Sequence, residues 1–303
     1  MFKLKEMTKE SITEWFLDLQ NRICKELELT DSKGLFKEDS WEREGGGGGK
    51  TRILENGELI ERGGVNFSAV HGPTPKNILE ALDLSPSDFY ATGVSIVMHP
   101  VNPMVPIIHM NVRYFEMSDG TAWFGGGIDL TPHYIDKKDA TYFHSQLKKV
   151  CDRHHFSYYP EFKAWADNYF FLPHRNETRG IGGIFFDKLS SNEEFSLKQR
   201  FAFVQDVGNS FAPIYTYFLN KNSKTDYGEN EKKWQMLRRG RYVEFNLVWD
   251  KGTKFGLDTS GRTESILMSL PPQANWQYNY QPKKDSPEEE TLQQLKKGID
   301  WIK

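Results

Sequence analysis

The order of the expected strands and helices constrains the fold of this 303-residue chain more than any other feature. Several strands follow one another without intervening helices, whereas a parallel doubly wound sheet would need a helix after each strand. We therefore expect an α+β fold in one domain over residues 1–303, with one large, mainly antiparallel sheet flanked by helices on both faces. Strands are expected at residues 94–98, 105–117 and 122–124, and a hairpin at residues 51–62 turns at Asn56-Gly57, a pair that favours a type I′ turn.

Apolar residues at helical spacing predict helices before and after these strands. Ser11 and Glu14 form a capping box for a helix at residues 11–29, within an N-terminal segment of residues 1–38. The pattern also predicts helices at residues 75–82, 137–153, 160–171, 193–220 and 229–238, and two more strands at residues 242–249 and 264–269.

Proline and glycine are expected to interrupt one of these helices, to end a second and to begin a further one. Pro213 should kink or split the long helix, and Gly240 should cap the helix before it. Ser286-Pro287 should begin a last helix within residues 284–303. The apolar stripe of that helix would consist of Leu292, Leu295, Ile299 and Ile302.

Charge and composition exclude several classes of protein. The chain has 39 Lys and Arg against 42 Asp and Glu, a net charge of −3, so no basic excess points to nucleic acid. The apolar runs are too short for a transmembrane helix, and the N-terminus lacks the apolar core of a signal peptide. Cys24 and Cys151 are read as free thiols in a reducing cytoplasm.

The expected strand at residues 105–117 carries the best local indication of a site. Because strand side chains alternate between faces, His109, Asn111 and Arg113 should share one face. The other face would hold Ile108, Met110 and Val112. Ile107 and Phe115 flank the polar trio with apolar groups, as in a small-molecule site. An ordinary solvent-exposed face remains the alternative.

A second polar face is predicted at residues 241–250. If this segment is a strand, Glu244, Asn246 and Asp250 share a face, where a carboxylate could act as a general base or accept N–H donors. An edge strand with a solvated face is the alternative. Arginines that could clamp carboxylates or phosphates gather nearby in the sequence, although ion pairs with acidic residues are the alternative. They are Arg175, Arg179, Arg238, Arg239, Arg241 and Arg262.

The sequence resembles the oxygen-dependent coproporphyrinogen III oxidases from about residue 41 to residue 280. The resemblance rests on ordered motifs rather than on one short match. They are residues 41–48 (WEREGGGG), 64–68 (GVNFS), 93–95 (GVS), 99–100 (HP), 109–113 (HMNVR), 123–132 (WFGGGIDLTP), 174–187 (HRNETRGIGGIFFD), 239–247 (RGRYVEFNL), 255–257 (FGL) and 265–272 (SILMSLPP).

The resemblance implies a homodimer with a large antiparallel sheet between helical layers. It implies oxidative decarboxylation of two propionates of coproporphyrinogen III to vinyl groups, which gives protoporphyrinogen IX in haem biosynthesis. O₂ would be the co-substrate, and no organic cofactor would be needed. Manganese is sometimes attributed to bacterial members of the family, so a divalent metal is possible.

The resemblance also carries roles over to individual residues. His109 matches a proton donor, and His174 is linked to the dimer interface, which corresponds to about residues 238–273. The substrate-binding positions are Ser95, Asn111, Val112, Arg113, Ser260, Gly261 and Arg262. The proposed metal ligands are His99, His109, His144 and His174, but no pair has the close spacing of a metal motif, so we expect no essential metal site.

The chemistry of a flexible tetrapyrrole adds three candidates. Asp129 or Asp250 could accept pyrrole N–H groups, and His109 or Asp250 could move protons. Lys251 could hold a propionate with Arg113 and Arg262, but it stands where the family usually has Arg and lacks bidentate geometry. The alternatives are a non-catalytic tetrapyrrole carrier and an oxygenase with a histidine-bound metal.

Overall fold

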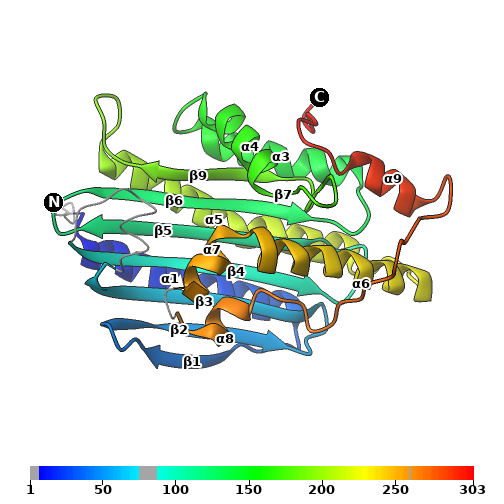
Figure 1. Cartoon of the computed structure of the whole chain (residues 1–303), viewed down its shortest axis with the longest axis horizontal. Coiled ribbons are helices and arrows are strands. Elements are labelled where there is room, and N and C mark those ends of the chain that lie inside the picture. The colour runs from blue at the N-terminus through cyan, green and yellow to red at the C-terminus, as the bar shows by residue number, and fades with distance from the viewer. Residues whose placement is uncertain (1–6, 75–86, 259–260) are drawn as a thin grey trace.

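A seven-stranded antiparallel sheet runs through the computed structural model, which describes residues 7–74, 87–258 and 261–303. Its strands lie in the order β1-β2-β3-β4-β5-β6-β9 (Figure 1). The α+β prediction is therefore confirmed. The strands are β1 (Lys37–Glu42), β2 (Gly47–Glu55), β3 (Ile60–Pro73), β4 (Asp88–Pro100), β5 (Ile107–Met117), β6 (Ala122–Thr131) and β9 (Gly183–Leu189), with β7 (Phe171–Leu172) and β8 (Glu177–Thr178) in a separate hairpin.

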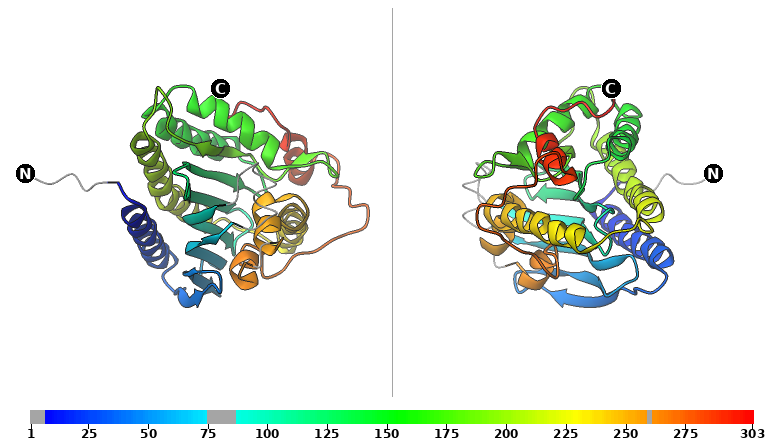
Figure 2. Two further views of the ribbon diagram at one scale, coloured as in Figure 1. Left: turned by 60° about the vertical axis from the view of Figure 1, so that its left-hand side comes forward. Right: turned by 90° about the vertical axis from the view of Figure 1, so that its right-hand side faces the viewer.

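Helices cover both faces of the sheet, as Figure 2 shows with the sheet seen from its side. The back carries α1 (Lys9–Asp31) and α5 (Leu197–Asn222), while α3 (Lys137–Asp152) and α4 (Tyr158–Tyr169) lie along the β9 side. The front carries α6 (Glu229–Glu244), the π-helix η1 (Phe245–Trp249), α7 (Lys251–Asp258) and α8 (Thr263–Leu267), and α9 (Pro287–Gln294) follows near the C-terminus.

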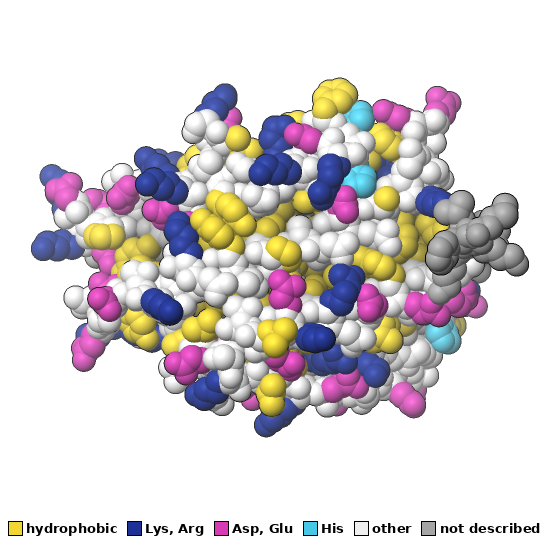
Figure 3. All heavy atoms as spheres, turned by 180° about the vertical axis from the view of Figure 1, so that it is seen from behind, with side chains coloured by type: hydrophobic (Ala, Val, Ile, Leu, Met, Phe, Trp, Pro, Cys, Tyr) yellow, Lys and Arg dark blue, Asp and Glu magenta, His cyan; other side chains and the backbone are white. Residues whose placement is uncertain are grey.

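The main core lies between the back of the sheet and the helices α1, α3, α4 and α5. It contains Phe16 and Leu19 of α1, Met110 of β5, and Phe203 and Phe211 of α5, each fully buried. Positively and negatively charged side chains are interspersed over the outside of this helical layer (Figure 3). None of the described helices is long and apolar enough to cross a membrane.

Several boundaries differ from the sequence predictions at their caps and turns. The capping box of α1 is Thr8 with Ser11, three residues before the predicted one. The hairpin of β2 and β3 is present, but only Asn56 of the Asn56-Gly57 pair has a positive φ, so the turn is not type I′. Gly57 is needed for another reason: a Cβ there would lie 2.5 Å from the Asp31 carboxylate.

Other predicted breaks fall in different places. The helix α5 runs through Pro213 without being split, and α6 runs through Gly240, where a Cβ would lie 2.5 Å from the Asn275 carbonyl oxygen. The last helix begins after Ser286 as predicted but ends at Gln294, and Gly298 follows with a φ of 77°. The helix predicted at residues 75–82 lies outside the described residues.

The two C-terminal strand predictions are wrong. Residues 242–249 form the end of α6 and the π-helix η1, and residues 264–267 lie in α8. In the helix, Tyr242 and Phe245 lie one turn apart, and both pack on the guanidinium of Arg179, at 4.7 and 4.6 Å from their ring centroids. This tertiary contact outweighs the strand propensity of an aromatic and β-branched run.

The buried carboxylate of Asp31 joins α1 to the β2–β3 hairpin. It accepts hydrogen bonds from the backbone N–H groups of Glu58, Leu59 and Ile60, at 2.8 to 2.9 Å. Burial alone would raise the pKa of Asp31, but these hydrogen bonds outweigh it and hold the pKa below its usual value.

We expect Asp31→Asn to lower the free energy of unfolding at pH 7 by about 2–3 kcal/mol, since hydrogen bonds to a charged group are the stronger ones. A depressed pKa stabilises the fold above the unfolded value of about 4, and this contribution is lost as the pH falls towards the folded value. The difference from wild type in urea titrations should therefore shrink below about pH 4. Asp18→Asn, at an exposed ion pair on the same helix, is the control and should cost under about 0.5 kcal/mol.

Candidate active site

A row of polar side chains crosses the front face of the sheet. Asn66 of β3 is paired with Ser95 of β4, and Ser95 with Asn111 of β5, so the three side chains share one face. Each is partly exposed, whereas the residues on either side of each in the sequence are buried. His109 and Arg113 lie on the same face as Asn111, as predicted from the sequence.

Apolar rings bound one end of this polar face. Phe115 stacks on Trp123 and on Phe89, with ring centroids 4.6 and 5.6 Å apart. The predicted combination of polar floor and apolar border is therefore present at this end of β5. Such a combination suits a ligand that carries both rings and charged groups.

Glycines of β6 let side chains reach across the floor. A Cβ at Gly125 would lie 2.5 Å from Oδ1 of Asp187 and 2.9 Å from a guanidinium nitrogen of Arg113. Arg113 of β5 consequently reaches over β6 to Asp187 near the end of β9, at 2.9 Å. Arg113 also donates to Asn111 at 3.2 Å.

A second arginine lies at the opposite edge of the sheet. Arg262, which precedes α8, is ion-paired with Asp39 of the edge strand β1. Asp39 is paired with Thr51, and Thr51 with Asn66, so Asp39 extends the polar row. At about 4.8 Å per strand, the two arginines border a floor on the order of 20 Å wide.

His109 is held from below by a buried ion pair. Its Nδ1 lies 2.8 Å from Oδ1 of Asp129, the residue opposite it on β6. Arg179 donates to both oxygens of Asp129, at 2.6 and 3.2 Å. An ionised Asp129 favours the tautomer of His109 that carries its proton on Nδ1, which leaves Nε2 for a ligand.

The surroundings of Arg179 explain how a full charge is held in the interior. Arg179 is 3% exposed and lies over the rings of Phe170, Tyr242 and Phe245, 4.5 to 4.7 Å from their centroids. It also donates to Asn246 of η1 at 2.9 Å. Burial would raise the pKa of Asp129, but Arg179 and the hydrogen bond to His109 outweigh it and lower the pKa.

Asp250 lies in the front layer, between η1 and α7. Its Oδ2 accepts from the backbone N–H and the hydroxyl of Thr253, both at 2.8 Å, so it caps the N-terminus of α7. Its Oδ1 accepts from the hydroxyl of Tyr169 at 2.8 Å. Asp250 is half-buried, whereas the neighbouring Lys251 is exposed.

The predicted strand face of Glu244, Asn246 and Asp250 is wrong because the segment is helical. Asn246 points inward to Arg179. Glu244 instead accepts hydrogen bonds from His174, Arg175, Arg241 and Trp276. Burial would raise the pKa of Glu244, but these donors lower it to about 2.

The four candidate metal-ligand histidines have separate environments. The buried His144 lies in the back core, between Tyr159 and the Ile181 carbonyl, and burial lowers its pKa to about 3. His99 contacts the Ser269 carbonyl through Nε2 at 2.8 Å. His174 stacks on Trp249, with ring centroids 5.9 Å apart. Among the described residues, no three His, Cys, Asp or Glu side chains are grouped as metal ligands, so these four do not fit one site.

The remaining candidates lie in different environments. The side chain of Val112 is fully buried in the back core, because it alternates with the front-facing residues of β5. Asp129 is 1% exposed, and both its oxygens are engaged by His109 and Arg179, so it supports His109 from behind. Gly261 is half-buried beside the Gly256 carbonyl, and Ser260 lies outside the described residues.

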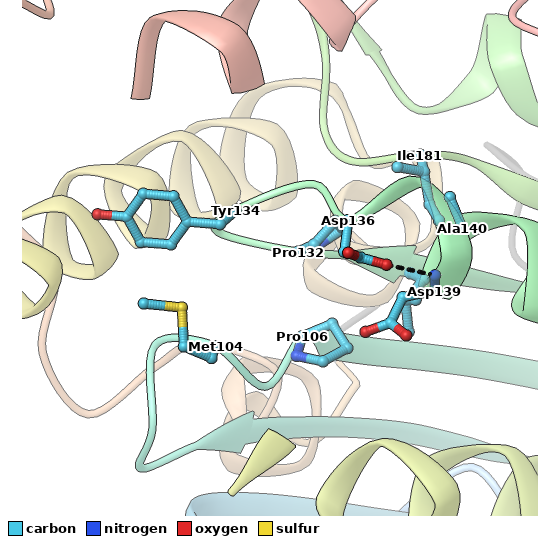
Figure 4. Close-up of a pocket in the computed structure, with 9 residues that line it drawn as sticks. Met104, Pro106, Pro132, Tyr134, Asp136, Asp139, Ala140 and Ile181 are labelled. Carbon is cyan, nitrogen blue, oxygen red and sulfur yellow. Dashed lines mark hydrogen bonds between the residues drawn. The ribbon is translucent and has the colours of Figure 1, made fainter. Parts of the chain in front are cut away.

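A small pocket beside the N-terminus of α3 is separate from this floor (Figure 4). It is lined by Met104, Pro106, Tyr134 and Ile181, among others, and its volume is about 10 Å³. Asp136 caps α3 there through the backbone N–H of Asp139 at 2.9 Å. The pocket has room for a water molecule and not for a tetrapyrrole.

The comparison with known families agrees with this geometry. The family model described as coproporphyrinogen III oxidase matches residues 11–301 of the 303. The chain belongs to the coproporphyrinogen III oxidase family. It is therefore an oxidoreductase of porphyrin biosynthesis, and coproporphyrinogen III is its substrate.

Three contributors to this site were not predicted individually. Asn66 could have been found, since it alternates with Val65 and Phe67 just as Asn111 alternates with its neighbours. Arg179 was one arginine in a cluster, and the sequence does not distinguish it from the exposed Arg175. Tyr169 comes from α4, and only tertiary structure brings it to Asp250.

We expect Asp129→Asn to destabilise the protein by about 3–5 kcal/mol, because it leaves the buried charge of Arg179 without its counter-charge. Asp187→Asn is the matched control, since it makes the same substitution at the partly exposed pair with Arg113 and should cost under about 1 kcal/mol. Urea unfolding at pH 7 measures both. Equal losses would show that burial of the Asp129–Arg179 pair has no special weight.

Proposed function

We propose that the chain catalyses oxygen-dependent decarboxylation of two propionates of coproporphyrinogen III to vinyl groups, giving protoporphyrinogen IX. The observation that carries the proposal is the polar floor, with His109 on one side, Asp250 above it and an arginine at each edge. Each propionate loses CO₂ and two electrons, and O₂ takes these up. The balance for each is R–CH₂CH₂COOH + O₂ → R–CH=CH₂ + CO₂ + H₂O₂.

The cationic side chains at the edges of the floor are suited to the propionates. Arg113 and Arg262 are already paired with carboxylates, those of Asp187 and Asp39, so their surroundings accept an anion. A propionate would replace the carboxylate of Asp187 or of Asp39 as the partner of the arginine. Lys251 is exposed and would add a third, less directional contact. Between the two arginines, Ser95 and Asn111 offer polar groups to the ring system.

Two groups are suited to moving protons. Asp250 has a lone pair left on its carboxylate. It would accept a hydrogen bond from a pyrrole N–H group or take the proton of that group. His109, whose Nε2 faces away from Asp129, would exchange a proton with the substrate. Asp129 then acts through His109 rather than by touching the substrate. An electron-rich pyrrole that has lost its N–H proton can itself react with O₂, so no organic cofactor is required.

The buried thiols are consistent with a cytoplasmic enzyme, which we also propose. Cys24 and Cys151 are free and buried, and burial raises the pKa of each to about 12. Neither is therefore poised to act as a thiolate.

An aerobic assay of the purified protein tests the proposed reaction. For each coproporphyrinogen III consumed, we expect two CO₂ and two H₂O₂. We also expect no turnover without O₂ and full activity in the presence of a chelator. Binding without consumption of O₂ would instead indicate a tetrapyrrole carrier. Activity lost on chelation and restored by manganese or iron would indicate the metal-dependent oxygenase.

In the same assay, Asp250→Asn should lower kcat by about 10²–10⁴-fold, the usual effect of losing a general base. Asn caps helices as well as Asp does, so the variant keeps the start of α7 while it removes the charge and replaces one carboxylate oxygen with an NH₂ group. Lys251→Arg should be tolerated, because it keeps the positive charge in an exposed position. Near-normal kcat in folded Asp250→Asn would move the proton-handling role to His109.

We further propose that the protein is a homodimer and that η1 lies in its interface. Exposed apolar side chains gather in this part of the front layer: Leu247, Val248, Trp249, Leu257 and Trp276 are 39–51% exposed. The indole N–H of Trp249 donates to His174 at 2.8 Å, and the two rings stack, which holds the surface in place. Apolar groups of this size commonly mark an interface.

Leu247→Asp should shift the protein from dimer to monomer in light scattering after gel filtration, because it places a charge in an apolar contact. Leu35→Asp is the control, since Leu35 is 70% exposed near β1, away from η1. A wild-type protein that is monomeric at micromolar concentration would contradict the homodimer.

A further inference from the structure

The last residue of α4, Tyr169, links this helix to Asp250 in the front helical layer. Tyr169 donates its hydroxyl to Oδ1 of Asp250 at 2.8 Å, although 81 residues separate them in the sequence. Burial and the adjacent Asp250 raise the pKa of Tyr169 above its ordinary value, so the hydroxyl keeps its proton and remains a donor.

The hydrogen bonds of Asp250 leave a defined direction open. A carboxylate has about four lone-pair sites, and Thr253 occupies two on Oδ2 through its N–H and its hydroxyl. Tyr169 occupies one on Oδ1, so the remaining site is on the same oxygen. The Tyr169 hydroxyl therefore determines where the remaining lone pair points.

The ring of Tyr169 is itself fixed to the floor. It stacks on Phe185 of β9, with ring centroids 4.1 Å apart and planes 14° from parallel. Phe185 is paired with Gly127 of β6, and a Cβ at Gly127 would lie 3.1 Å from the Phe185 ring. A residue with a side chain at Gly127 would displace this stack. The hydroxyl is thus held at a set height above the row that contains Asn111.

The next residue, Phe170, contacts the other proton-handling group. Its ring lies edge-on to His109, at 6.1 Å between centroids, and under the guanidinium of Arg179 at 4.5 Å. Two consecutive residues at the end of α4 therefore touch the surroundings of both His109 and Asp250. A shift of this helix end would move both groups relative to the substrate.

We propose that Tyr169 is a positioning residue for Asp250, which it holds with one carboxylate oxygen directed at the substrate during proton transfer. This inference rests on the proposed function, because it assumes that Asp250 handles the proton. Tyr169 would act on kcat and not on propionate binding, since the arginines that hold the propionates lie at the edges of the floor.

The decisive variant is Tyr169→Phe, which removes the hydroxyl and keeps the stack on Phe185. We expect kcat to fall about ten- to a hundredfold, the effect of one hydrogen bond to a charged group, with KM changed less than about twofold. Tyr158→Phe is the matched control. It removes a tyrosine hydroxyl from the same helix, one that is paired with Arg200 in the back core, and should leave kcat unchanged.

A double-mutant cycle separates positioning from a general structural effect. If Tyr169 acts through Asp250, adding Tyr169→Phe to Asp250→Asn should lower kcat less than about twofold further. Circular dichroism and a cooperative melting transition check that each variant is folded. Asp250→Glu serves as the background if the activity of Asp250→Asn is too low to measure.

The outcomes distinguish this inference from the proposed function. Loss of activity in Asp250→Asn with normal kcat in Tyr169→Phe would overturn the role of Tyr169 and leave that of Asp250 intact. Additive effects in the double variant would show that Tyr169 acts on the fold, which also overturns the inference. Normal kcat in Asp250→Asn would overturn both assignments together.

Discussion

The buried guanidinium of Arg179 is the interaction on which the front half of the molecule depends. It joins the sheet, through Asp129, to the front helical layer, through Asn246, and three aromatic rings enclose it. A charge in such a place is stable only with its partners present, because the cost of removing it from water is large. The interaction with Arg179 therefore fixes the position in which α6 and η1 pack on the sheet. The same pair fixes the orientation of His109, so one arrangement serves both the fold and the proposed chemistry.

The front of the sheet differs from the back because polar side chains and glycines replace much of its apolar surface. On the back, Ile108, Met110 and Val112 fill a continuous core. On the front, Gly125 and Gly127 leave space that Arg113, Asp187 and Phe185 occupy from neighbouring strands. The result is a polar face with a charged group at each edge and aromatic groups at one end.

Much of the candidate site could be predicted because strand alternation is a local property. The period of two in residues 107–114 correctly placed His109, Asn111 and Arg113 on one face of β5, the face that carries the polar row. The supporting residues could not be predicted in this way. Whether a carboxylate faces a ligand or supports a histidine depends on its neighbours in the folded chain. Asp129 is hydrogen-bonded to both His109 and Arg179. Tyr169 and Asp250 are 81 residues apart in the sequence, so only the tertiary structure brings them together.

The sequence by itself determined the antiparallel sheet, its amphipathic covering helices and the face on which β5 carries polar groups. These follow from hydrophobic periodicity, which needs only neighbouring residues. Tertiary structure alone decided the state of residues 242–249, where an alternation of polar and apolar residues favours a strand. As a strand, Tyr242 and Phe245 would point to opposite faces, and only a helix brings both onto Arg179. The burial of one paired charge against two rings outweighed the local preference, and it thereby placed Asp250 above the floor.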